Sequence, residues 1–184
     1  MEDVLLRKVR DFADAAHGTQ MRKYTPERYI VHPVRVMETV RSYSNKLPML
    51  AAALLHDVLE DTPVSKEEML QFLKEIMTLA DAEETVRLVI ELTDVFVKEN
   101  FPKLNRKQRK QKEAERIAET SADAQTIKYA DILDNCTEIS LLNPGFAPRY
   151  LRECLAILNV ADKGDPELYA QTLNVVKKNL AHLN

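Results

Sequence analysis

Apolar residues recur at the three- and four-residue spacing of an α-helix along most of the chain, and this feature limits the fold more than any other. No stretch of five or more residues shows convincing apolar and polar alternation, as a half-buried strand would. Glycine is scarce, with 3 in 184 residues, where average usage gives roughly thirteen. We therefore predict an all-α fold, with eight or nine helices in one domain over residues 1–184.

Turn residues and capping patterns delimit these helices. Gly18 ends the first, and Asn143-Pro144-Gly145 is a strong stop before the last two, which lie within 145–184. Ser65 to Glu68 is a capping box, and Asp81 to Glu84 is a weaker relative with Asp81 as the cap. After Gly18, helices are predicted at about 33–43, 48–61, 66–79, 82–97, 104–119, 122–142, 147–160 and 166–182.

Charge and composition exclude several classes of protein. The chain has 26 basic and 29 acidic residues and a net charge of −3, which does not suit a general nucleic-acid coat. Its longest apolar run, Leu47 to Leu55, is too short to span a bilayer. The two cysteines, Cys136 and Cys154, are too few for a disulfide framework. We expect a cytoplasmic protein without nucleic-acid or membrane partners, and a homo-oligomer remains open.

The segment from Leu47 to Asp61 carries the densest group of titratable side chains. It begins with nine uncharged residues, as a buried helix does, and then places His56 beside Asp57. Glu60 and Asp61 follow one helical turn later. A divalent cation is one reason for an imidazole and a carboxylate at such a place. The alternative is a core histidine bonded to a backbone carbonyl, with the acids marking a helix end.

Two further pieces carry potential ligands. Asp131 and Asn135 share one helical face, with Lys128 and Asp134 beside them, which on pattern alone is more typical of an ordinary solvated stripe. His32 stands at the start of a predicted helix, directly before Pro33, where a single histidine usually has no special role.

Together these pieces resemble a known family. His32, His56-Asp57 and Asp131 match in order and spacing the metal positions of the HD-domain phosphohydrolases. The segments 17–23, 29–33, 52–62 and 128–131 resemble, more narrowly, the hydrolase domain of the Rel/Spo alarmone enzymes. The resemblance covers about residues 8–142. Because the chain is too short to hold the synthetase half of those enzymes, it resembles the stand-alone small alarmone hydrolases.

The resemblance implies an all-α HD domain with Mn²⁺ held by His32, His56, Asp57 and Asp131. The donor types agree, because imidazole and carboxylate without thiolate suit Mn²⁺ and similar ions. Glu60 and Asp61 would position the attacking water and move its proton. The expected reaction removes pyrophosphate from the 3′ position of guanosine tetraphosphate and leaves GDP.

An anionic nucleotide substrate also needs basic contacts. By the same resemblance, Arg22 and Lys23 contact the nucleotide, Lys103 and Arg106 reach phosphates, and Asn135 helps to hold the substrate. For most of the basic run from Lys103 to Lys112, a solvated helix face is the favoured interpretation.

Two positions depart from the family pattern. Ile132 stands where the family usually has a basic residue, and Asp134 stands where it usually has His or Tyr. These departures keep a second hypothesis open, an HD-domain hydrolase of another phosphate ester such as a nucleoside monophosphate or NADPH. A third hypothesis is a metal-free helical domain that binds a nucleotide or a partner.

Overall fold

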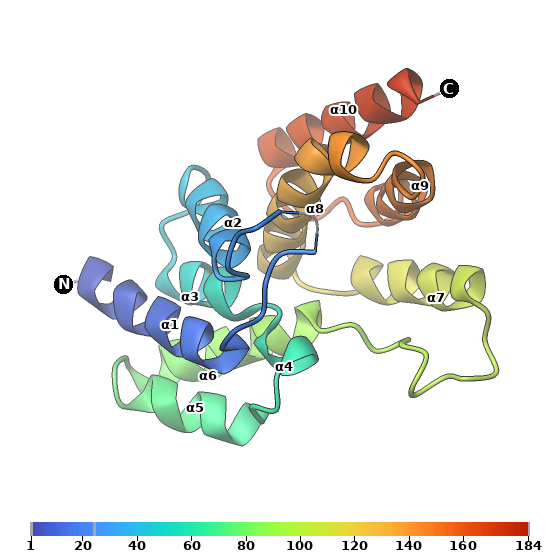
Figure 1. Ribbon diagram of the computed structural model, residues 1–184. Coiled ribbons are helices and arrows are strands. Elements are labelled where there is room, and N and C mark those ends of the chain that lie inside the picture. Colours follow the sequence, from blue (N-terminus) through green and yellow to red (C-terminus); the bar gives the residue numbers. More distant parts are fainter. Residues whose placement is uncertain (1, 24, 184) are drawn as a thin grey trace. The chain divides into compact units, whose positions relative to one another are not determined.

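The computed structural model describes residues 2–23 and 25–183, and over these residues the protein is all-α (Figure 1). The one β-type pairing among them is an isolated bridge between Met21 and Arg28. The prediction of an all-α fold is confirmed. In chain order the helices are α1 (Glu2–His17), α2 (Val31–Arg41), α3 (Leu47–Leu55), α4 (Val58–Asp61), α5 (Lys66–Lys74), α6 (Leu79–Leu92), α7 (Arg106–Ala118), α8 (Ala122–Leu142), α9 (Ala147–Leu158) and α10 (Pro166–His182).

The chain divides into two compact units. The first runs to Thr93 and carries α1 to α6, and the second starts at Asp94 and carries α7 to α10. Each unit has its own buried apolar core, centred on α3 in the first and on α8 in the second. The single domain expected from the sequence remains a prediction.

Helix α3 forms the centre of the first unit. All residues from Met49 to Leu55 are at most 2% exposed, and the helix packs against α1, α2 and α6 (Figure 1). Seven consecutive buried residues cover every side of a helix, as the uncharged sequence predicts. Burial of each leucine contributes about 1.5–3 kcal/mol. The end of α3 is therefore held firmly in place.

The helix predicted over 48–61 is interrupted. Helix α3 ends at Leu55, His56 and Asp57 form a turn, and α4 begins at Val58. Asp57 has φ −98° and ψ −5°, which lies in the sparsely populated bridge region where active-site residues often occur. Its carbonyl accepts the Asp61 amide at 2.9 Å, so one helical turn still separates these two residues. This break also explains why the described residues hold ten helical segments rather than eight or nine.

Capping decides the start of α6. The sequence prediction of a cap at Asp81 is wrong, because Thr78 caps a helix that runs from Leu79 to Leu92 instead of 82–97. The Thr78 hydroxyl oxygen accepts the Asp81 amide at 3.1 Å, and the hydroxyl donates to Asp81 Oδ2 at 2.7 Å. Asp81 is thus a first-turn residue. The capping box that starts at Ser65 is present as predicted.

In the second unit, α8 packs against α9 and α10. Tyr129 on α8 is fully buried, and its hydroxyl donates to the Ala161 carbonyl at 2.8 Å. The Gly164 amide donates back to that hydroxyl at 3.2 Å. These bonds attach the loop before α10 to the middle of α8. The two cysteines, Cys136 and Cys154, are both buried and free.

Among the described residues, every helix is too short or too polar to cross a membrane.

Candidate metal centre

Three predicted ligands come together in the first unit. His32 is the second residue of α2, His56 follows the last residue of α3, and Asp57 precedes α4. Their potential ligand atoms all lie within 4.8 Å of one another. Residues 24 positions apart in the sequence thus meet because α2 packs against α3.

The carboxylate of Asp57 lies at the centre of this group. Its Oδ2 is 2.9 Å from His56 Nε2 and 3.8 Å from His32 Nε2. The two imidazole rings meet edge to face, with their centroids 5.2 Å apart. Both histidines are nearly buried, at 1% and 4% exposure, whereas 21% of the Asp57 side chain is exposed. The group is therefore open to solvent on the carboxylate side.

The second nitrogen of His56 supports a metal-binding role. His56 Nδ1 lies 2.8 Å from the Ala53 carbonyl, so it carries the proton and leaves the Nε2 lone pair directed toward Asp57. Metal-binding histidines are usually fixed in this way by a backbone carbonyl. The backbone bond of the alternative core-histidine hypothesis is thus present, but it is compatible with a ligand. Two imidazoles and a carboxylate fit a borderline or hard divalent cation.

Two neighbouring residues for which no individual role was predicted from the sequence also contact the site. The Tyr29 hydroxyl donates to Asp57 Oδ2 at 2.5 Å. The Gln20 amide nitrogen donates to Asp61 Oδ2 at 3.0 Å, and its oxygen accepts from His17 Nδ1 at 2.9 Å. Both residues lie in segments quoted for the family resemblance. That membership was the only available signal, because the bonds join distant parts of the chain.

The two predicted catalytic acids lie at the exposed edge of the first unit. Glu60 and Asp61 are both exposed and belong to the short helix α4. Asp61 is oriented by Gln20, which lies 41 residues earlier in the loop after α1. That loop folds back on itself, because the Tyr29 amide donates to the Gln20 carbonyl at 3.0 Å. Carboxylates at an exposed edge can exchange protons with solvent.

The fourth predicted ligand, Asp131, lies on α8 in the second unit. It is 7% exposed, which corrects the interpretation of this face as an ordinary solvated stripe. Lys128 Nζ donates to Asp131 Oδ2 at 2.8 Å, and Asn135 Nδ2 donates to Asp131 Oδ1 at 2.7 Å. The three residues thus form one polar cluster. That Asp131 joins the histidines at a metal remains a prediction.

The predicted basic contacts lie in two different segments. Arg22 is half-buried and Lys23 exposed in the loop before α2, while Lys103 is exposed in the segment before α7. Arg106 is the first residue of α7, and its guanidinium donates two hydrogen bonds to the Glu153 carboxylate, at 2.7 and 2.8 Å. This pairing raises the pKa of Arg106. The substrate roles of these four residues remain predictions.

Comparisons with known proteins agree with the sequence resemblance. Residues 29–136 match the HD domain family model. A guanosine-3′,5′-bis(diphosphate) 3′-pyrophosphohydrolase of Borreliella burgdorferi is 33% identical over 156 residues, which are 81% of this chain and 21% of that protein. The chain thus spans about a fifth of that relative's length. The enzyme of the same name designated MESH1 in Mus musculus is 34% identical over 147 residues, 78% of this chain and 74% of that protein.

Solved structures give the same result. A structure described as a metazoan ortholog of SpoT that hydrolyzes ppGpp superposes with a TM-score of 0.78 at 25% identity, over 96% of both chains. A crystal structure from Listeria monocytogenes has a TM-score of 0.63 at 22% identity over 86% of this chain, which supports the fold alone. The resemblance stated from the sequence is confirmed.

Proposed function

Because this chain belongs to the HD-domain family of phosphohydrolases, we propose that it hydrolyses guanosine tetraphosphate to GDP and pyrophosphate. The observation that carries the proposal is the group of His32, His56 and Asp57, whose ligand atoms converge within 4.8 Å. Its relatives, which include MESH1 from mouse and the Borreliella enzyme, bear the name of this activity. The same support argues against a domain that only binds and holds no metal.

We further propose that His32, His56, Asp57 and Asp131 hold one divalent cation. When bound, the cation acts as a Lewis acid toward a phosphoryl oxygen and lowers the pKa of a water molecule. Tyr29 keeps Asp57 oriented by its hydrogen bond to Oδ2. The imidazole of His56 keeps its tautomer through its bond to Ala53.

The two acids of α4 are the proposed acceptors of the proton from the attacking water. In this mechanism Glu60 and Asp61 orient the attacking water and accept its proton. The Gln20 amide holds Asp61 Oδ2, which leaves Oδ1 for the water. The water oxygen forms a bond to the phosphorus nearest the ribose, and the bond from that phosphorus to the 3′ oxygen breaks. The 3′ oxygen takes up a proton and leaves as a hydroxyl on GDP, while pyrophosphate departs.

The basic residues and one amide bind the substrate in this proposal. Arg22 and Lys23 contact the nucleotide, and Lys103 and Arg106 contact phosphates. Asn135, which donates to Asp131, lies one turn from the proposed ligand and completes the nucleotide contacts. Charge-assisted hydrogen bonds of this kind are roughly twice as strong as neutral ones.

A chromatographic assay tests the activity. Purified protein with Mn²⁺ and guanosine tetraphosphate is expected to release GDP and pyrophosphate in equal amounts. His56→Ala and Asp57→Ala should each lower kcat by about a thousandfold or more, because several kcal/mol of transition-state stabilisation depend on the cation. His182→Ala and Asp162→Ala are matched controls on exposed residues and should retain full activity. No product at micromolar enzyme would contradict the proposal.

The choice of Mn²⁺ rests on the donor set, which has imidazoles and carboxylates and no thiolate. Protein stripped with a chelator and reloaded with Mn²⁺, Mg²⁺ or Zn²⁺ is expected to be most active with Mn²⁺. Elemental analysis of the purified protein gives an independent readout. Higher activity with Zn²⁺, together with stoichiometric zinc in the purified protein, would assign a different metal to the same site.

Ile132 supports a second candidate substrate class. Its side chain is 1% exposed, so this position packs in the core of the second unit and offers no basic contact. Its neighbour Asp134 adds a carboxylate on the same helix. An HD-domain hydrolase of another phosphate ester fits these two departures. A panel with nucleoside monophosphates and NADPH, read by phosphate release, separates this candidate from the first by relative kcat/KM.

A further inference from the structure

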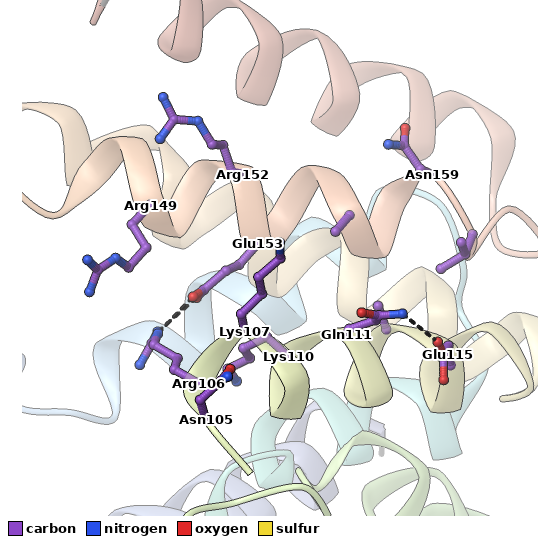
Figure 2. A pocket seen from close by; sticks show the side chains of 13 residues that line it. Asn105, Arg106, Lys107, Lys110, Gln111, Glu115, Arg149, Arg152, Glu153 and Asn159 are labelled. Atoms are coloured by element: carbon purple, nitrogen blue, oxygen red, sulfur yellow. Dashed lines mark hydrogen bonds and ion pairs between the residues drawn. The ribbon is translucent and has the colours of Figure 1, made fainter.

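A large open groove lies between α7 and α9 in the second unit. It has a volume of 970 Å³ and is lined by residues of these two helices and their ends (Figure 2). Ligand pockets commonly measure about 300–1,000 Å³, so the groove has room for one small organic molecule. Of the residues assigned above to the metal, the catalytic acids and the substrate, Arg106 is the one that also lines this groove.

Positive charge gathers at one end of this groove. Lys107 on α7 and Arg149 and Arg152 on α9 line it and form no ion pair among the described residues. Arg106 and Lys110 also line it, but they are already paired with Glu153 and Asp94. The lining has five basic and two acidic side chains, in a chain whose net charge is −3. The local excess of positive charge therefore favours the binding of an anion.

The other end of the groove differs in character. Figure 2 shows Arg149, Arg152 and Arg106 toward the left, and Gln111 and Asn159 toward the right. The basic residues come from the first halves of α7 and α9, where the helix dipoles add positive potential. Ala114, Ala156 and Val160 supply apolar surface in the later turns and beyond α9.

This distribution defines the chemistry of a ligand. Lysine and arginine bind phosphate oxygens, and small apolar side chains accept the flat face of a ring. Gln111 Nε2 already donates to Glu115 Oε1 at 3.2 Å, so the Gln111 carbonyl oxygen and the Asn159 amide are the groups that can bond to the edge of a heterocycle. Three small apolar residues are too few for an amphipathic peptide helix, which needs an extended stripe.

We propose that the groove between α7 and α9 binds a nucleoside polyphosphate, with its phosphates at Lys107, Arg149 and Arg152 and its base over Ala114 and Ala156. The bound molecule is a ligand of the second unit and is not consumed. Its binding requires no metal ion.

Calorimetry with GTP and ATP in the presence of EDTA tests the proposal. At low ionic strength we expect one site per chain and weaker binding as salt is raised, because screening reduces the attraction between charges. Arg149→Glu/Arg152→Glu should weaken binding by about a hundredfold, since each guanidinium contact is equivalent to about tenfold or more. Lys177→Glu/Lys178→Glu makes the same charge change on exposed residues of α10 and should leave the affinity unchanged.

Two further measurements test the apolar end of the groove and its independence from the active site. Ala156→Trp fills the apolar floor, so it should abolish the advantage of GTP over tripolyphosphate while leaving tripolyphosphate binding intact. Arg22→Glu/Lys23→Glu, which removes two proposed substrate contacts in the first unit, should bind GTP as the unchanged protein does. Equal affinity for tripolyphosphate and GTP in the unchanged protein, or loss of GTP binding in the Arg22/Lys23 variant, would overturn the proposal. Circular dichroism confirms that each variant is folded.

Discussion

At the scale of single residues, Tyr29 determines how the Asp57 carboxylate is presented. Its hydroxyl donates to Asp57 Oδ2 at 2.5 Å. Its ring is fixed between two imidazoles, with centroids 4.5 Å from His17 and 6.0 Å from His32. Such contacts restrict both the tyrosine and the carboxylate. Asp57 can therefore meet a cation without first losing rotamer freedom.

We expect Tyr29→Phe to weaken metal binding by about 10- to 100-fold, the usual effect of losing a hydrogen bond to a metal ligand. The apolar ring and its packing remain, so the fold should not change. Titration calorimetry with Mn²⁺ measures the affinity. Tyr169→Phe is the matched control, because it removes a tyrosine hydroxyl that donates to the Leu158 backbone carbonyl on α9 and not to a proposed metal ligand. Equal affinity in Tyr29→Phe and the unchanged protein would show that Tyr29 does not orient the ligand.

The sequence predicted part of the candidate site well. His32, His56 and Asp57 meet as expected, because their spacing and residue types match a specific motif. The roles of Tyr29 and Gln20 could not be predicted, because they depend on bonds across 28 and 41 residues. Local periodicity carries no information on how a loop folds back.

At the scale of elements, a loop glycine packs directly against α8 in the second unit. A Cβ placed on Gly164 would lie 2.5 Å from the Tyr129 ring and 2.8 Å from the Thr126 backbone nitrogen. Neither distance is sterically allowed, and the Thr126 backbone cannot move without disturbing α8. Gly164 therefore permits the loop before α10 to approach α8.

Gly164→Ala is expected to destabilise the protein by about 1–3 kcal/mol, the usual effect of overpacking a tight site. Gly145→Ala is the control, since its Cβ would meet nothing nearer than the Asn143 side chain at 3.9 Å. Urea unfolding followed by circular dichroism gives both free energies. Similar midpoints for the two variants would mean that the loop moves away at little cost.

Most helices could be predicted from the sequence, but some of their ends could not. Gly18, with φ +57°, ends α1 as expected, because glycine accepts a left-handed conformation. The start of α6 was misassigned because Thr78 and Asp81 are both good caps, and only the hydrogen bonds distinguish them. The break after Leu55 could not be predicted, because no proline or glycine stands next to it in the sequence.

At the scale of the whole molecule, binding of the proposed metal ion is expected to stabilise the folded chain. A ligand that binds only the folded state stabilises it by RT ln(1 + [L]/Kd), about 2.7 kcal/mol at a hundredfold excess over Kd. For a chain of this length, this corresponds to a rise in Tm of about 5–10 °C. Mn²⁺ should produce such a rise in the unchanged protein, and a chelator should reverse it.

Asp131→Asn should reduce the Mn²⁺-dependent rise in Tm by more than half, because the cation loses one charged ligand. Asp134→Asn removes the same charge from the same helix and should keep the full rise. Differential scanning calorimetry with and without Mn²⁺ measures each difference within one variant, so a change in basal stability does not affect it. An equal rise in the two variants would remove Asp131 from the ligand set and leave the three residues of the first unit.

The burial of α3 on every side has a consequence for how an ion is taken up. A helix that is enclosed by its neighbours cannot slide or tilt, so His56 at the end of α3 is already in position before an ion binds. Loading then costs little conformational entropy. A rigid site of this kind also discriminates among ions by their radius. It favours the ions whose preferred coordination distances match the positions that the ligands already have.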